Sequence, residues 1–191
     1  MKHRLSHCTS GQALSLLREG QADLALGLQL KRERGLAQHT LGLARLVALA
    51  PPEVLTPHKA RAPREGLARA MRDPLDWAQL AEQGEILVPR EAPLIAHARK
   101  TCAGLLPAWP RLIEVDSPAT AAALARAQGS VALMSEQSAR LFCSDGLALH
   151  RLGAPEVRLP ICLFSSTDSI KGMAKPFLGL LSEAYATARA S

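Results

Sequence analysis

The sequence predicts an α/β protein in which helices pack against parallel strands. Within residues 112–134, a strand-like segment is followed by a helical segment and then by a short apolar segment suited to a buried strand. Strand-like and helical segments also alternate along most of the remaining chain. A strand–helix–strand unit normally makes a parallel pair through a right-handed crossover. We therefore expect a sheet assembled from such units.

The helix expected within residues 112–134 has recognisable ends. Asp116 and Ser117 carry side-chain oxygens suited to accept hydrogen bonds from the free amides of a helix start, and Pro118 suits the first helical position. Gly129 suits the end of the helix. A helix start at the carboxyl end of a strand also favours binding of an anion or a polar ligand. This segment therefore predicts a candidate site as well as a topology.

The other elements follow from apolar spacing and from breaker residues. Gly20 is expected to end the first helix, and Asp73 to cap a later one. The prolines of residues 51–63 predict a loop or linker, and Pro160 places its strand at a sheet edge or a bulge. The further expected strands are 2–8 (an edge), 22–28, 36–41, 44–50, 85–91, 147–152 (an edge) and 157–166, and the further helices are 10–19, 65–71, 74–84, 93–106, 135–142 and 169–190.

The composition indicates a folded domain without a membrane anchor. Hydrophobic residues make up 48% of the chain, which excludes a disordered protein. No apolar run approaches the about 20 residues that span a bilayer. The start of the sequence, MKHRLSHCTSGQ, lacks the apolar core of a signal peptide. We therefore expect a cytoplasmic protein with one domain or two small ones.

The net charge of +6 raises the question of nucleic-acid binding. Its excess of arginine is scattered among alanine and leucine, with the densest part at residues 58–72. One Tyr, two Trp and three Phe provide little surface for stacking on bases. The sequence contains no zinc-finger, RNP-like or helix-turn-helix pattern. We expect no direct contact between this chain and nucleic acid.

The cysteines and histidines do not predict a metal site. Cys143 and Cys162 lie in apolar segments, so we expect buried free thiols. His3, His7 and Cys8 are close in sequence, but they lie in a polar terminal segment where a solvated surface is expected. We therefore expect neither a metal nor another cofactor.

The sequence also lacks a pattern that would predict an enzyme. It contains no Gly-x-Ser-x-Gly segment. Ser135, Asp145 and His150 are near one another in sequence, but a turn and an edge strand would place them on the surface. We therefore expect no enzymatic activity.

An ordered series of features extends over residues 10–185. These are a helix ending at Gly20, an Asp-containing strand at 23–28, Gly-Leu at 35–36, Leu41, an apolar strand reaching Pro51, the acidic strand and Ser-led helix of 112–134, the segment 145–152, and the segment 160–184. In this order they resemble the effector-binding domain of LysR-type transcriptional regulators. The resemblance implies a periplasmic-binding-protein-like (type 2) fold, with two Rossmann-like subdomains joined by crossover strands. It implies one subdomain at residues 1–80 plus 165–191 and the other at residues 81–164.

Two departures from the family pattern are expected. The N-terminal winged helix-turn-helix and the linker helix have no counterpart in this sequence. The first strand and helix of the effector domain also have none, because Met1 aligns near the second strand of the family. Such a chain would expose a sheet edge and favour a homodimer or a higher oligomer.

The resemblance implies that a small effector binds in the cleft between the subdomains. Strand ends and helix starts would line this cleft, and the implied contacts are Thr9, Ser10, Pro89, Arg90, Glu91, Ser117, Phe164 and Ser165. Arg90 suits an effector carboxylate, because a guanidinium binds a carboxylate with two hydrogen bonds. Five of these residues also have a structural interpretation: helix capping for Thr9, Ser10 and Ser117, an ion pair with Glu91 or another surface group for Arg90, and core packing for Phe164.

Three functions are consistent with these features. The first is the ligand-sensing domain of a LysR-type regulator, which would bind a small, anionic effector and shift the population of its conformations. DNA would be bound only through a helix-turn-helix domain outside this chain. The second is a truncated paralogue that senses no ligand and acts as an interaction module. The third is a stand-alone solute-binding protein, which the lack of a signal peptide disfavours.

Overall fold

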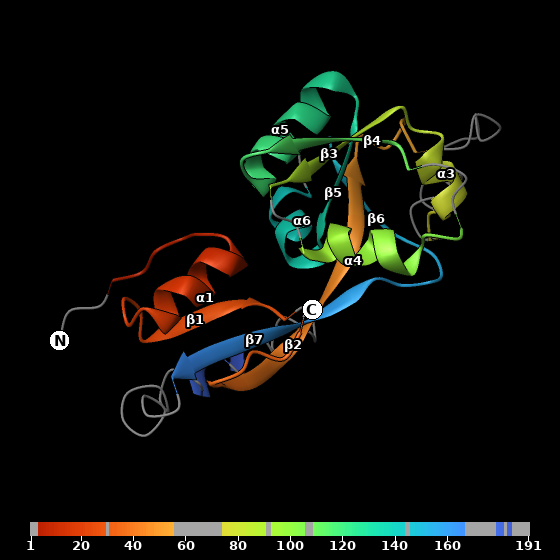
Figure 1. Cartoon of the computed structure of the whole chain (residues 1–191). Coiled ribbons are helices and arrows are strands. Elements are labelled where there is room, and N and C mark those ends of the chain that lie inside the picture. Colours follow the sequence, from red (N-terminus) through yellow and green to blue (C-terminus); the bar gives the residue numbers. More distant parts are fainter. Residues whose placement is uncertain are drawn as a thin grey trace. The chain divides into compact units, whose positions relative to one another are not determined.

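The structure is a computed structural model, and the chain forms two compact units in it (Figure 1). Unit 1 comprises residues 1–43 and 159–191, and unit 2 comprises residues 44–158. These units divide at 43/44 and 158/159, because strand β2 (Leu36–Ala50) continues beyond residue 43 into the sheet of unit 2. The subdomain bounds at 80/81 and 164/165 stay a prediction. The described residues are 4–29, 31–55, 74–90, 93–105, 109–143, 146–166, 179–181 and 183–184.

Unit 1 contains a small sheet with helix α1 (Ser10–Arg18) packed against it. Strand β7 (Arg158–Ser166) lies between β1 (Leu24–Leu28) and the first part of β2, and it is antiparallel to β1. Helix α1 packs against β1. The buried core of this unit contains residues from the helix and from both of the paired strands: Leu17, Ala25, Cys162 and Phe164.

Unit 2 contains a mixed sheet in the order β2-β5-β3-β4, and β6 (Ala148–Arg151) is a further partner of β2. Strand β3 (Glu85–Pro89) is parallel to β4 (Arg111–Val115) and to β5 (Val131–Ser135), whereas β2 is antiparallel to β5 and β6. The predicted strand–helix–strand unit is therefore present. Its two strands, β4 and β5, are not neighbours, however, because β3 lies between them.

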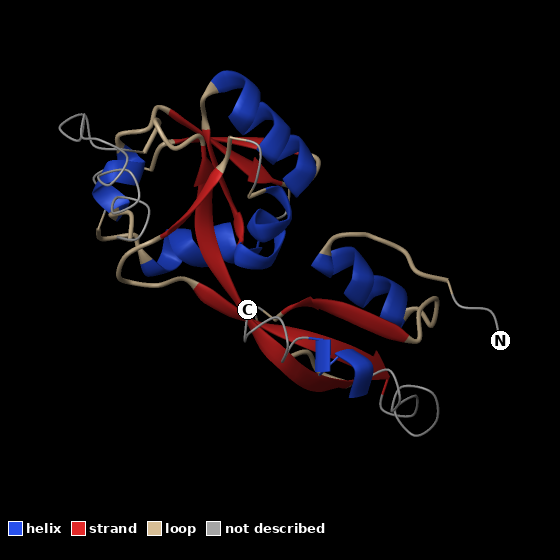
Figure 2. Cartoon of the chain, turned by 180° about the vertical axis from the view of Figure 1, so that it is seen from behind, coloured by secondary structure: helices blue, strands red, loops and turns tan. Residues whose placement is uncertain are grey.

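Helices pack on the sheet of unit 2. Helix α5 (Pro118–Gln128) contacts β3, β4 and β5, and α6 (Glu136–Phe142) contacts α5 and β5. Helix α4 (Pro93–Thr101) also contacts β5, and the views show α3 (Trp77–Ala81) on the side of the sheet away from α5 (Figures 1 and 2). The mixed α/β class predicted from the sequence is confirmed.

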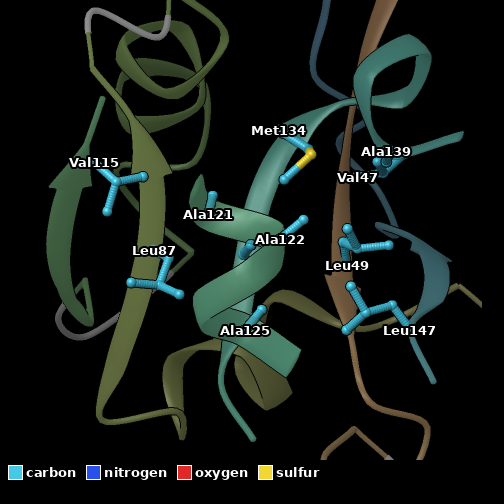
Figure 3. Packing of buried hydrophobic residues seen from close by; sticks show 11 residues of the cluster. Val47, Leu49, Leu87, Val115, Ala121, Ala122, Ala125, Met134, Ala139 and Leu147 are labelled. Carbon is cyan, nitrogen blue, oxygen red and sulfur yellow. The ribbon is translucent and has the colours of Figure 1, made fainter. Parts of the chain in front are cut away.

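A cluster of buried apolar residues joins α5 to the sheet of unit 2. Figure 3 shows the small side chains of Ala121, Ala122 and Ala125 among larger strand residues. These three alanines are at most 2% exposed. Small residues on this helix face allow close approach to the sheet, because little side-chain volume separates the helix from the strands. The residues of the cluster are Val47, Leu49, Leu87, Val115, Ala121, Ala122, Ala125, Ala132, Met134, Ala139 and Leu147.

Four local predictions were wrong. Residues 4–8 form no strand, and the two strands expected at 36–41 and 44–50 are one continuous strand. Asp76, instead of Asp73, caps α3, because Leu75 is held in a bridge to Leu152 before the helix begins. Strand β7, which contains Pro160, is not an edge strand among the described residues, because it lies between β1 and β2; the bulge, the other possibility for Pro160, stays a prediction.

Several predictions lie outside the described residues. They concern the helix at 65–71, Glu91, Asp145, residues 56–63 of the loop, residues 2–3, and most of the helix at 169–190. Residues 179–181 and 183–184, which belong to that last segment, are helical. Within the described part of the chain, no helix has the length and apolarity that crossing a membrane requires.

The cysteines differ in their burial. Cys102 and Cys162 are buried free thiols, as predicted for Cys162, and burial raises the pKa of the Cys102 thiol. The prediction for Cys143 was wrong, because this residue is exposed just after α6. Across the described ranges, His, Cys, Asp and Glu side chains form no group of three or more suited to hold a metal ion.

Candidate functional site

Polar side chains meet where β3 and β4 end. The two strands are parallel, with Pro89 opposite Val115, so Arg90 and Asp116 follow at the same edge of the sheet. The backbone N–H of Arg90 donates to the Val115 carbonyl oxygen at 2.7 Å. The Arg90 guanidinium Nη2 lies 3.3 Å from Asp116 Oδ1. Both side chains are largely exposed, 64% for Arg90 and 83% for Asp116, so a ligand in solution has access to this pair.

Ser117 begins α5 at this same edge. Its Oγ accepts a hydrogen bond from the Thr120 N–H at 3.2 Å and lies 3.0 Å from Thr120 Oγ1. The capping role that the sequence predicted for Ser117 is therefore confirmed. The start of the 11-residue helix carries a partial positive charge, because the peptide dipoles align along its axis. The arginine and the helix start together make this edge favourable for an anion.

The end of β5 contributes two further polar residues to this edge of unit 2. Ser135 caps α6 by accepting a hydrogen bond from the Ser138 N–H at 3.2 Å, and Glu136 is the first residue of that helix. Because β5 runs parallel to β3, their carboxyl ends face the same way. Neither residue was predicted from the sequence to belong to the site. The available signal was a polar residue directly after the buried apolar segment Val131–Met134.

The two predicted site residues beside Arg90 have different outcomes. Pro89 is the last residue of β3 and is half-buried, with Val115 opposite it in the neighbouring strand. Glu91 lies outside the described residues. Arg90 has its ion pair with Asp116, whereas the sequence suggested Glu91 as one partner.

In unit 1, Thr9 and Ser10 lie at the start of α1. Thr9 forms a capping box with Gln12, in which each side chain accepts a hydrogen bond from the backbone N–H of the other residue. Ser10 Oγ accepts a hydrogen bond from the Leu28 N–H at 3.3 Å. A Cβ atom at Gly27 would lie 3.1 Å from Ser10 Oγ, so the helix start and the end of β1 approach closely.

A polar group follows β1 close to this helix start. Gln29 Oε1 accepts a hydrogen bond from Cys162 Sγ at 3.4 Å, and Gln29 Nε2 donates to Gln38 Oε1 at 2.5 Å. Thr40 Oγ1 lies 3.6 Å from the same sulfur. Sequence reasoning did not find this group, because Cys162 is more than a hundred residues away from the glutamines.

Phe164 and Ser165 are buried in unit 1. Phe164 is 1% exposed and packs in the core cluster with Leu17, Ala25 and Cys162. Ser165 is 3% exposed, and its Oγ has no hydrogen-bond partner within the described part of the chain. Core packing accounts for Phe164 without a ligand, whereas the Ser165 hydroxyl retains an unused hydrogen-bonding capacity. Their role as effector contacts stays a prediction.

The sequence expected Ser135, Asp145 and His150 on the surface, and for His150 this was wrong. His150 is 3% exposed in β6, and burial lowers its pKa. The Ser135 hydroxyl donates to Ser138 Oγ at 2.9 Å, and Asp145 lies outside the described residues. Ser135 therefore acts locally at a helix start.

The family model of the LysR substrate binding domain matches residues 2–186 of this sequence. The chain belongs to the LysR substrate-binding domain family. The match extends over nearly the whole chain and over both units, and it confirms the resemblance inferred from the sequence. A search of curated proteins finds no match.

Solved structures agree with this assignment. The domain resembles the OxyR2 regulatory domain (C206S mutant) from Vibrio vulnificus, with a TM-score of 0.65 and 15% identity over 93% of this chain and 77% of that one. It resembles the BenM effector binding domain with its effector benzoate, with a TM-score of 0.70 and 16% identity over 96% and 78%. Full-length CbnR complexed with its target DNA gives a TM-score of 0.69 and 16% identity over 94% and 59%. LysR substrate-binding domains have the periplasmic-binding-protein type 2 fold, so the predicted fold class is confirmed.

Proposed function

We propose that this LysR substrate-binding domain senses a small anionic effector as part of a transcriptional regulator. The observation that carries the proposal is the meeting of Arg90 with the start of α5 at the carboxyl edge of β3 and β4. A guanidinium binds a carboxylate with two hydrogen bonds, and a helix start adds a partial positive charge. A small carboxylate is therefore the effector class that this edge suits.

The effector would bind between the two subdomains, with contacts from both. From unit 2, the proposed contacts are Pro89, Arg90, Glu91 and Ser117, and from unit 1 they are Thr9, Ser10, Phe164 and Ser165. The proposal is supported by BenM, a structural relative whose effector binding domain was solved with benzoate, a carboxylate. Binding that favours one conformation would shift the population of the domain toward it.

The signal would pass to DNA through another part of the regulator. CbnR, which this chain resembles in fold, was solved in complex with its target DNA, and this chain spans 59% of that protein. We propose that the domain regulates transcription in the cytoplasm by biasing a helix-turn-helix domain outside these residues, without enzymatic activity of its own.

The test is a thermal-shift and calorimetry screen of acetate, benzoate and succinate against the wild-type domain. Arg90→Ala should abolish binding of any carboxylate that binds, because it removes the charge that pairs with the ligand. The matched control is Arg126→Ala, which removes an exposed arginine from the last turn of α5, at the opposite end of the same helix. Binding that survives in Arg90→Ala would remove Arg90 from the site.

Light scattering on the same samples separates the sensing domain from the interaction module. We propose a homodimer, and dimers that bind one of the carboxylates would support the sensing function. A stable oligomer that binds none of the three carboxylates would instead favour the interaction module.

A further inference from the structure

Two segments connect unit 2 to the rest of the chain, and they lie side by side. The chain enters unit 2 at Ala44 on β2 and leaves it at Arg158, the first residue of β7. The backbone N–H of Leu46 donates to the Val157 carbonyl oxygen at 2.9 Å, which fixes one connecting segment against the other. We call residues 44–46 and 156–158 the exit segments.

Arg45 joins both exit segments to helix α6. Its Nη1 lies 3.3 Å from Glu136 Oε2, at the start of α6, and its Nε lies 3.7 Å from Glu156 Oε2. Glu156 is also paired with Arg158, and Glu136 Oε1 lies 3.0 Å from Arg140 Nη2. All five residues belong to unit 2. One network of charges therefore spans the entry, the exit and the first turn of α6.

Burial makes the centre of this network stronger than an ordinary surface pair. The side chains of Arg45 and Glu136 are 24% and 14% exposed, whereas those of Arg111 and Glu85, which pair at the other end of β3 and β4, are 77% and 53% exposed. Solvent screens an exposed pair, so it contributes little to stability. A partly buried charge that loses its partner is costly, because its lost hydration is no longer compensated.

We infer that Arg45 is a positioning residue that couples the start of α6 to both exit segments. Glu136 directly follows Ser135, which ends β5 at the carboxyl edge of the sheet. A ligand that shifts the start of α6 would therefore act on the segments through which the chain passes between its units. This last step rests on the proposed function, whereas the coupling itself is a property of the ligand-free domain.

Hydrogen exchange of the ligand-free domain tests the coupling. Arg45→Gln should speed exchange of the Leu46 amide by about tenfold, the change expected when a hydrogen-bonded charge pair is lost. Strands β3 and β4 should exchange as in the wild type. Glu156→Gln changes a partner that is 40% exposed, so it carries little risk to folding and should speed exchange of the same amide. The matched control is Arg151→Gln, which makes the same charge change at an exposed position of the neighbouring strand β6.

Two results would overturn the inference. The first is an unchanged exchange rate of the Leu46 amide in both Arg45→Gln and Glu156→Gln. The second is an equal increase of the exchange rates in β3 and β4, which would indicate general destabilisation.

A second measurement adds benzoate. In the wild type, benzoate should change the exchange rates of the exit segments. In Arg45→Gln this effect of benzoate should be lost, while the Kd for benzoate stays within about twofold of the wild-type value. Failure of all carboxylates to bind would count against the proposed function alone, because the ligand-free rates still decide the role of Arg45.

Discussion

Asp116 Oδ1 lies 3.3 Å from Nη2 of Arg90, so a carboxylate of the protein already occupies the guanidinium that we propose for the effector. An incoming carboxylate therefore competes with Asp116 for this guanidinium. The cost of displacement is small, because both side chains are largely exposed and an exposed ion pair contributes about 0.2–1 kcal/mol. Asp116 therefore lowers the affinity for a carboxylate ligand only modestly.

Asp116→Asn should raise the affinity for carboxylates by about two- to fivefold, because the competing charge is removed while the side-chain size is kept. Calorimetry with the carboxylate that binds the wild type gives the comparison. The double variant Arg90→Ala/Asp116→Asn should show no gain over Arg90→Ala. An equal or lower affinity of Asp116→Asn would show that Asp116 does not compete with the ligand.

Ser117→Asp should separate helix capping from ligand binding. Aspartate is a good N-cap and its charge suits a helix start, so the free energy of unfolding should stay within about 0.5 kcal/mol of the wild type. The same charge would repel an anionic ligand, so carboxylate affinity should fall by at least about tenfold. Ser117→Asn, a neutral cap, is the control, and its affinity for the carboxylate should fall by less than that of Ser117→Asp. Undiminished binding by Ser117→Asp would place the ligand away from the start of α5.

Local signals predicted the elements that form the candidate edge. Ser117 and Gly129 lie at the two ends of α5, with the cap and the left-handed backbone (φ +64°) that the sequence indicated. Arg90 was predicted near the end of a strand, and it directly follows β3. These features depend on residues near one another in sequence, so capping and apolar spacing suffice to find them.

Non-local pairing explains what the sequence analysis missed. The sequence predicted two strands at 36–41 and 44–50, yet β2 is continuous because β7 pairs with its first part and β5 with its second. The ion pair of Arg90 depends on the register that sets Pro89 opposite Val115. Arg45 and Glu136 are even further apart in sequence, and only the complete sheet brings them together.

The buried imidazole of His150 should make stability depend on pH. Burial lowers its pKa in the folded state, so the unfolded chain takes up a proton more readily. The free energy of unfolding should therefore be greatest above the unfolded pKa of about 6.5 and should fall as the pH drops below it. Urea denaturation between about pH 5 and pH 8, a range set by the approximate unfolded pKa, should show this fall in the free energy of unfolding.

Two variants assign this pH dependence. His150→Gln should lose most of the dependence of the free energy of unfolding on pH, whereas His39→Gln, at an exposed position of unit 1, should keep it. An identical slope in His150→Gln would assign the pH dependence to other groups.

The packing of α5 on the sheet leads to a prediction about volume. Ala125 is 0% exposed and lies in the cluster with Leu87 and Met134, so a larger side chain there must push the helix away from the strands (Figure 3). Ala125→Leu should lower the free energy of unfolding by about 1–3 kcal/mol, the usual cost of overpacking. Ala123→Leu makes the same change on the exposed side of the helix and should stay within about 0.5 kcal/mol of the wild type. Urea denaturation of the two variants gives the comparison. Equal free energies of unfolding for the two variants would mean that the helix lies less tightly on the sheet than the cluster indicates. Because α5 begins beside Arg90, Ala125→Leu should also weaken carboxylate binding.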